Sequence, residues 1–436
     1  MSPEMIGLIG IGLFLLLIAL KVPISFAMII SGFLGFGTII SFPAAVSLMP
    51  TEIYSTFSSY SLSVIPMFIW MGFIAYHSGI GAGLFRFAHK MVGHRPGGLA
   101  IATQAACALF GAICGSNTAT AATMGAIALP EMRKYGYDDS LSSASVAAGG
   151  ALGVIIPPSV IFIVYGIATQ QSIGKLFIAG IVPGILLMLL YMLAIYIVVK
   201  RKPSLGPVSM KYGWRDRVQT LGDGLFEVLF IFLFSLGGLF AGWFTPTEAG
   251  AIGTASILLV TVLRKHLNLA KLRKSLIDTV RTTSMIMLMV AGAMVFGRFI
   301  AVSRLPIFLA QWAAGLPLPP FAIMGVILVV YLILGCFIDA LALILLTIPI
   351  FYPVAVGTLG YDPIWFGVII VLVVAMGVIT PPVGMNVFIV KGVAGDIPTE
   401  TIFKGVWPFV IALMVCVALL IAFPQIVTFF PNLLSA

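Results

Sequence analysis

Two copies of a diproline motif lie inside long apolar stretches of this 436-residue chain. The first reads GVIIPPS from Gly153 to Ser159, and the second reads GVITPPV from Gly377 to Val383, 224 residues later. A prolyl pair removes two backbone donors and breaks the preceding helical turn. Within hydrocarbon it is tolerated where the freed carbonyl oxygens meet protein, water or a ligand. Paired breaks of this kind are typical of transport sites.

Further neutral oxygen atoms lie close to both breaks. Ser159 and Thr380 supply hydroxyls, Asn386 supplies an amide, and the prolines of each pair, including Pro157 and Pro382, leave carbonyls exposed. Such ligands suit Na⁺ and would make a poor zinc or copper site. The alternative is that both breaks only kink their helices, but their duplication in register favours a binding site.

A second kind of polar interruption precedes the first break. Residues 96–130 form an uncharged run that is interrupted by GSNTAT and flanked by basic residues, which favours a hairpin that enters and leaves on the same side. Gly115 can form the turn, and Ser116, Asn117 or Thr118 can cap the second arm. The free carbonyls of the first arm can hold a small cation, and the free N–H groups of the second arm favour an anion. Alternatively, these small residues only permit close helix packing.

The equivalent hairpin in the second half covers 321–351 and turns near Gly335 to Asp339. Asp339 is the only acid in this stretch. An acidic residue at membrane depth is a functional candidate by default. The alternative is a structural carboxylate that holds the tip of the hairpin.

The composition requires a membrane protein. Hydrophobic residues make up 61% of the chain and charged residues 8%, and the apolar runs are continuous, which indicates helices and not barrel strands. The net charge of +9 comes from Lys and Arg in short loops, which orientation in the membrane explains better than nucleic-acid binding. We find no Ser/His/Asp set, paired acids or metal-binding cluster, so we do not expect an enzyme.

The chain is predicted to contain two copies of one unit. GYD at 136–138 recurs at 360–362 with the same offset as the diprolines. We place the first unit at about 1–205, a basic cytoplasmic linker at 206–223, and the second unit at 224–436. Each unit should contain a re-entrant hairpin and a broken helix, at about 96–131 and 140–170 in the first unit and about 321–351 and 363–390 in the second.

The distribution of basic residues predicts that the two units are inverted. If each unit crosses five times, only Lys175, Arg298 and Arg304 lie outside, and the remaining 20 of the 23 Lys and Arg residues face the cytoplasm. An odd number of crossings then gives the units opposite orientations. The segments 81–90 and 268–281 are expected to be amphipathic helices at the cytoplasmic surface.

Several motifs in order resemble the large membrane subunit, of DctM type, of the tripartite ATP-independent periplasmic (TRAP) transporters. They are GSNTATAATMGAIALPEMRKYGYDD, GWFTPTEAGAIG, GCFIDALALILLTIP and GVITPPVGMNVF. The resemblance implies a multi-pass protein of the bacterial inner membrane that takes up a small organic acid, driven by Na⁺. It also implies delivery by a periplasmic binding protein, a separate small membrane subunit of about four helices, and an elevator motion.

The resemblance further implies which residues bind the ion and the substrate. The expected Na⁺-binding residues lie at the hairpin tips and the breaks: Gly115, Ser116, Asn117, Gly153, Pro157, Gly335, Gly377 and Thr380. The expected substrate-binding residues lie between the tips and beside the breaks: Ser116, Asn117, Thr118, Ser159, Asp339, Pro382 and Asn386. The acid could be a C4-dicarboxylate, a sialic acid, another sugar acid or a sulfonate. The alternative function is a stand-alone Na⁺/dicarboxylate symporter of the divalent-anion type, which shares the hairpin and SNT pattern.

Overall fold

The computed structural model describes residues 1–222, 224–315 and 317–433, and this part of the chain is helical without a strand. Residue 223, the end of the predicted linker, and residues 434–436, the end of the predicted second unit, lie outside the described residues. By length and composition, seven described helices could cross a membrane, or eight if one bent pair counts as a span. The predicted all-α membrane class is confirmed.

The helices of the first half follow one another with short connections. In chain order they are α1 (Pro3–Ala19), α2 (Ile24–Ile39), α3 (Phe42–Phe57), α4 (Val64–Ser78), α5 (Ile80–Val92), α6 (Gly98–Cys114), α7 (Asn117–Lys134), α8 (Asp139–Ile155), α9 (Val160–Thr169) and α10 (Ile173–Arg201). Short 3₁₀ turns cover Tyr60–Ser63, Pro203–Leu205 and Thr220–Gly222.

The second half begins after a short linker helix, α11 (Trp214–Gln219). Its helices are α12 (Leu225–Phe232), α13 (Gly238–Phe240), α14 (Pro246–Leu263), α15 (Leu269–Val302), α16 (Leu305–Gly315), α17 (Pro320–Gly335), α18 (Ala340–Tyr352), α19 (Pro363–Gly377), α20 (Met385–Ala394), α21 (Thr399–Ala422) and α22 (Gln425–Leu433). Wider π-helical turns cover Leu233–Gly237 and Pro353–Thr358.

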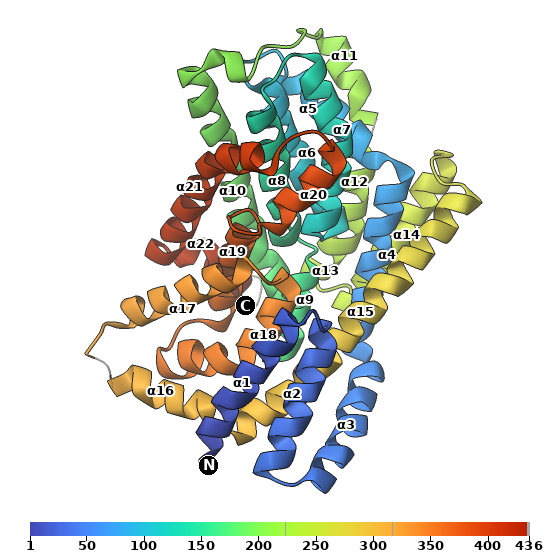
Figure 1. The fold of residues 1–436 in the computed structure, drawn as a ribbon. Helices are drawn as coiled ribbons and strands as arrows, with labels where there is room; N and C mark the ends of the chain where they lie inside the picture. The colour runs from blue at the N-terminus through green and yellow to red at the C-terminus, as the bar shows by residue number, and fades with distance from the viewer. Residues whose placement is uncertain (223, 316, 434–436) are drawn as a thin grey trace.

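The order of helices repeats along the chain. The hairpin α6–α7 and the broken helix α8–α9 have counterparts in α17–α18 and α19–α20. Each counterpart begins and ends close to 224 residues after the first copy. Gly136 and Gly360, also 224 residues apart, both adopt a left-handed conformation, with φ of 74° and 75°. Figure 1 shows the first hairpin in the upper part of the molecule and the second in the lower part. The unit boundaries at 205 and 224 stay a prediction.

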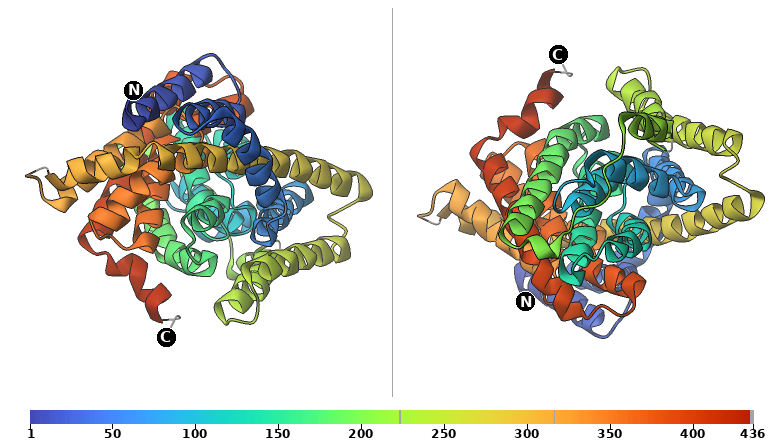
Figure 2. Two further views of the ribbon diagram at one scale, coloured as in Figure 1. Left: turned by 90° about the horizontal axis from the view of Figure 1, so that it is seen from below. Right: turned by 90° about the horizontal axis from the view of Figure 1, so that it is seen from above.

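One expected element is absent as a separate helix. Residues 268–281, predicted to be an amphipathic surface helix, form the first part of the 34-residue α15, which runs across the molecule (Figure 2). The prediction was wrong because no glycine or proline interrupts the chain between 269 and 291. The amphipathic pattern at 81–90 does form a helix, α5, but its apolar face packs against α6.

Each hairpin touches its broken helix at a pair of glycines. A Cβ added to Gly111 of α6 would lie 2.8 Å from the Cα of Gly153 in α8. A Cβ added to Gly377 of α19 would lie 2.5 Å from the carbonyl carbon of Gly335 in α17. The two contacts are equivalent, because each glycine of the second pair lies 224 residues after its counterpart in the first pair. Glycine allows the two backbones to approach without side chains between them.

The two halves also pack across one another. The second arm of each hairpin lies against the broken helix of the other half, α7 against α20 and α18 against α9. Tyr165 of α9 in the first half donates to the carbonyl of Pro363, the first residue of α19 in the second half. The hairpins and broken helices therefore form one packed body around the centre of the molecule.

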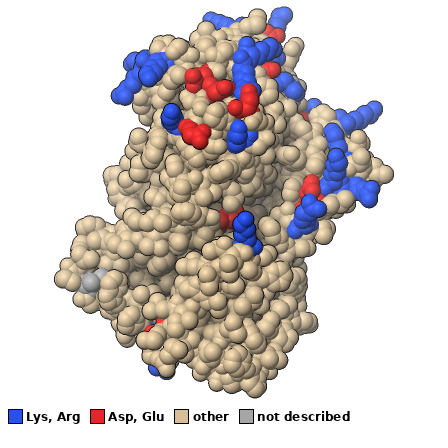
Figure 3. Space-filling view, viewed as in Figure 1, with Lys and Arg blue, Asp and Glu red and all other residues tan. Residues whose placement is uncertain are grey.

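Basic residues gather at one end. Figure 3 shows Lys and Arg over the upper end and along the right edge, with few charges over the lower part. This end carries α5, α11 and the α14–α15 connection (Figure 1). The positive-inside rule predicts that this end faces the cytoplasm.

The glycine contact at Gly377 predicts a sharp difference between two alanine substitutions. Gly377→Ala places a methyl group against backbone that cannot move aside, and we expect it to cost about 1–3 kcal/mol of stability. Gly325→Ala in α17 is the matched control, because nothing lies within 4 Å of its added Cβ. Thermal unfolding of the purified variants in detergent should show a lower midpoint for Gly377→Ala alone. Equal midpoints would contradict the close contact.

Candidate functional site

Both hairpin tips open onto one cavity of about 520 Å³. Gly115 to Thr118 line it from the first tip, and Asp339 to Leu341 line it from the second. The opposite wall comes from α4 and α15, which lie outside the hairpins and broken helices. Figure 3 shows this face hollowed, with acidic and basic groups together near the middle. The structure thus joins tips that are more than 200 residues apart in the sequence.

The first tip is a capped helix start, as predicted. Gly115 takes a left-handed conformation with φ of 62° and ends α6. The Ser116 hydroxyl accepts a hydrogen bond from the Ala119 amide at 3.4 Å and lies 3.0 Å from the Thr118 hydroxyl. The Asn117 side-chain oxygen accepts from the Thr118 amide at 2.9 Å. The N-terminus of α7, with its positive dipole end, therefore faces the cavity.

The first break presents unpaired backbone oxygens to this tip. Within the described residues, the carbonyls of Gly115, Pro157 and Pro158 accept no hydrogen bond. The Pro158 oxygen lies against the tip, since a Cβ added to Gly115 would be 2.5 Å from it. Both diproline peptide bonds, Pro157–Pro158 and Pro381–Pro382, are cis.

The second break has the same character. The carbonyls of Gly335, Thr380 and Pro381 accept no hydrogen bond in the described part of the chain. A Cβ added to Gly377 would lie 2.8 Å from the Gly335 oxygen, so this tip also meets its break closely. The Thr380 hydroxyl donates to the Met376 carbonyl at 2.7 Å, which leaves the lone pairs of the hydroxyl oxygen available to a cation.

Asp339 caps a helix at the second tip and also faces the cavity. Its carboxylate accepts from the Leu341 amide at 3.0 Å and caps α18, as a structural carboxylate would. The residue also lines the cavity.

Several predicted substrate residues lie outside the cavity lining. Ser159 is fully buried and caps α9 by accepting from the Phe162 amide at 3.4 Å. Pro382 is not among the lining residues. Asn386 is fully buried and donates to the Ala147 carbonyl at 3.1 Å. Its side-chain oxygen, like the side-chain nitrogen of Asn117, is buried and has no hydrogen-bond partner within the described chain.

Of the predicted ion-binding residues, only those of the first tip line the cavity itself. Gly115, Ser116 and Asn117 are part of the lining. The others are not among the lining residues: Gly153, Gly335 and Gly377 lie at the close contacts between hairpin and broken helix, and Pro157 and Thr380 lie in the breaks.

The sequence analysis missed a polar group on the opposite wall. Asp278 and Arg281 of α15 and Tyr76 of α4 line the cavity, although Arg281 was assigned to a cytoplasmic basic stretch. His77 Nε2 lies 2.8 Å from an Asp278 oxygen and joins α4 to α15. The signal was the spacing of Asp278 and Arg281, which places them on one face of a helix.

The comparisons with known proteins decide the family. The family model for the DctM component of the tripartite ATP-independent periplasmic transporters matches residues 11–426. The chain belongs to this family. As a DctM-family protein it is a multi-pass component of the inner membrane in a transporter of three parts, and its relatives are named as transporter permeases and not as enzymes.

Two relatives of this DctM-family chain show how close the likeness is. It is 37% identical over 408 residues to the C4-dicarboxylate TRAP transporter large permease protein DctM of Pseudomonas aeruginosa, covering 93% of this chain and 94% of the relative. It is 35% identical over 377 residues to the sialic acid TRAP transporter large permease protein SiaM of Vibrio cholerae, covering 86% and 87%.

A solved structure supports the fold. The YdaH transporter of Alcanivorax borkumensis, which has an unusual topology, matches 88% of this chain and 90% of its own with a TM-score of 0.61. At 14% sequence identity, the match concerns the fold alone.

The cavity predicts which substituted cysteines react with a thiol reagent. Thr118→Cys should react at least several-fold faster than Ser159→Cys with a bulky polar maleimide, because reaction requires an accessible thiol. Thr118 lines the cavity, whereas Ser159 is fully buried. The four native cysteines are buried, so the native chain gives the background. Equal rates for the two variants would contradict this description of the cavity.

Proposed function

We propose that this chain is the large subunit of a TRAP transporter that takes up a small organic acid together with Na⁺. The observation that carries the proposal is the convergence of both hairpin tips, each backed by a break with unpaired carbonyls, on one cavity. A hairpin tip and a break together offer what the two solutes need: neutral oxygens for a cation and N–H groups for an anion.

The Na⁺ ions would bind at the two contacts between hairpin and break. At the first contact, the oxygens come from Gly115, Pro157 and Pro158. At the second, they come from Gly335, Thr380 and Pro381. Buried carbonyls without donors are costly unless something replaces water, and a bound cation does so.

The organic anion would lie in the cavity between the tips. The start of α7 with the hydroxyls of Ser116 and Thr118 would hold a carboxylate, and Arg281 supplies a positive charge from the opposite wall. The described lining also holds two acids, Asp278 and Asp339. Since one guanidinium faces two carboxylates, the lining does not attract an anion until a cation is present. This charge balance supports binding of Na⁺ before the acid.

The proposed transport step is an elevator motion. Hairpins and broken helices would move as one block against α4 and α15, since the cavity lies between these two groups of helices. Each net positive charge moved inward gains about 2.3 kcal/mol per 100 mV of membrane potential. One uncompensated Na⁺ per cycle would therefore already drive accumulation.

The proposed partners are a small membrane subunit of about four helices and a periplasmic binding protein. The relatives from Pseudomonas aeruginosa and Vibrio cholerae are named for a C4-dicarboxylate and a sialic acid, so family membership leaves the acid open. The alternative, a stand-alone Na⁺/dicarboxylate symporter of the divalent-anion type, would need neither partner.

Removing one oxygen ligand should lower the affinity for Na⁺ while the protein still folds. We expect Ser116→Ala and Thr380→Ala each to raise the Na⁺ concentration for half-maximal uptake about fivefold, which corresponds to about 1 kcal/mol. Uptake into reconstituted vesicles measures this. The controls are Ser172→Ala, which removes a similar helix cap at 3.3 Å, and Thr169→Ala, which removes a similar 2.7 Å bond to the carbonyl four residues earlier. An unchanged Na⁺ concentration for half-maximal uptake in both test variants would count against Ser116 and Thr380 as Na⁺ ligands.

The partner requirement separates the two candidate functions. Vesicles that contain the chain and its small subunit should take up the acid only when the binding protein is added outside. Transport by the purified chain alone, at the same rate with and without the other two proteins, would favour the stand-alone symporter.

A further inference from the structure

A second cavity lies at the basic end of the molecule, away from the hairpin tips. It has a volume of about 380 Å³ and lies between α5, α7 and the start of the linker between the two halves. It shares no lining residue with the cavity between the tips. The side chains that matter here are Arg86, His89, Lys90, Lys134, Tyr135 and Tyr212.

The charges in this second cavity are unequal. Lys90 and Lys134 bring two positive charges from two helices, and Glu131 is the only acid among the described lining residues. Lys90 Nζ lies 5.6 Å from the centre of the Tyr212 ring, and Lys134 Nζ lies 6.0 Å from that of Tyr135. Cation–π contacts of this length hold an ammonium group against the wall. The cations therefore converge on a concave space between fixed aromatic walls.

The back wall of the second cavity is rigid. His89 is buried, and its Nε2 lies 2.9 Å from the hydroxyl of Ser209 in the linker. The Tyr135 and Tyr212 rings pack edge-on against the imidazole at 5.6 Å and 5.8 Å. Burial lowers the pKa of His89, so the imidazole is neutral at pH 7 and adds no charge. Hydrogen bond and ring contacts together hold the linker on α5.

We propose that this second cavity binds a phosphate group at the cytoplasmic end of the protein. Ammonium and tyrosine hydroxyl groups are donors, and a phosphate offers charged oxygens to several donors at once. The phosphate can belong to the headgroup of an anionic phospholipid or to a soluble cytoplasmic compound. Basic groups at the cytoplasmic surface attract the headgroups of anionic lipids. A ligand here would bridge the linker and the base of the first hairpin.

Thermal unfolding of the full chain in lipid nanodiscs tests the site. One arm compares discs of phosphatidylcholine alone with discs that also contain phosphatidylglycerol. The other keeps phosphatidylcholine discs and compares potassium phosphate with potassium chloride at equal ionic strength. We expect a midpoint several degrees higher in one arm. A rise with phosphatidylglycerol alone identifies a headgroup, and a rise with potassium phosphate identifies a soluble phosphate.

Paired variants separate the second cavity from general surface charge. The double variant Lys90→Gln with Lys134→Gln should no longer show the higher unfolding midpoint. The double variant Lys90→Arg with Lys134→Arg should still show it. The matched control is Lys200→Gln with Lys274→Gln, which removes the same charge and includes a lysine 5.9 Å above a tyrosine ring outside the cavity. No rise for the native chain in either arm, or an equal rise in the glutamine pair, would overturn the proposal. Neither result bears on Na⁺-coupled uptake, which depends on the other cavity.

Discussion

Backbone carbonyl oxygens without donors are the constraint on which this structure depends. A membrane protein normally satisfies every backbone group inside a helix, because lipid supplies no hydrogen bonds. Here both diproline breaks leave oxygens that accept no hydrogen bond from the described residues, and glycines at Gly111, Gly153, Gly335 and Gly377 let a hairpin approach each break closely. A larger side chain at these positions would separate the two backbones. Small residues and proline pairs therefore have to occur together, and the chain uses the combination twice.

Much of this arrangement could be predicted from the sequence because its causes are local. Two adjacent prolines break a helix wherever they occur, and a glycine followed by Ser116 turns and caps a chain within a few residues. The duplicated offset then relates the two halves without any knowledge of their packing. For these reasons, the sequence alone was enough to predict the positions of the hairpins and the breaks and the residues of the first tip.

The parts that were missed depend on long-range packing. The basic stretch at the start of α15 resembles a surface helix, but it continues into the apolar part of the same helix without a break. Arg281 lines the cavity only because α4 lies beside this part of α15, where His77 meets Asp278. Likewise, Ser159 and Asn386 are close to the breaks in sequence, yet both point into packed helices. Sequence spacing indicates which residues are near a break, but not which side of it faces a ligand.

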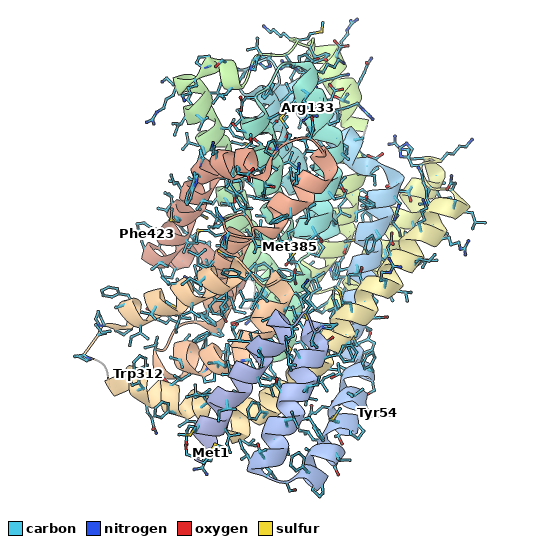
Figure 4. All side chains as sticks on the ribbon, in the orientation of Figure 1. Met1, Tyr54, Arg133, Trp312, Met385 and Phe423 are labelled. Carbon is cyan, nitrogen blue, oxygen red and sulfur yellow. The ribbon has the colours of Figure 1, made fainter. Side chains whose placement is uncertain are left out.

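The contacts between the two halves bear on how such a protein could move. Arg133 at the end of α7 donates to Asp396 after α20 at 2.8 Å, and this bond lowers the pKa of the Asp396 carboxyl. Figure 4 shows Arg133 in the upper part of the molecule and Met385, where α20 begins, near the middle, and α7 packs against α20. Asn386 adds a buried bond to the Ala147 carbonyl. If the proposed elevator operates, the first hairpin cannot move without the second broken helix. The boundary that slides must then be the one with α4 and α15, where Gly72 of α4 already lets the Cys114 backbone approach closely.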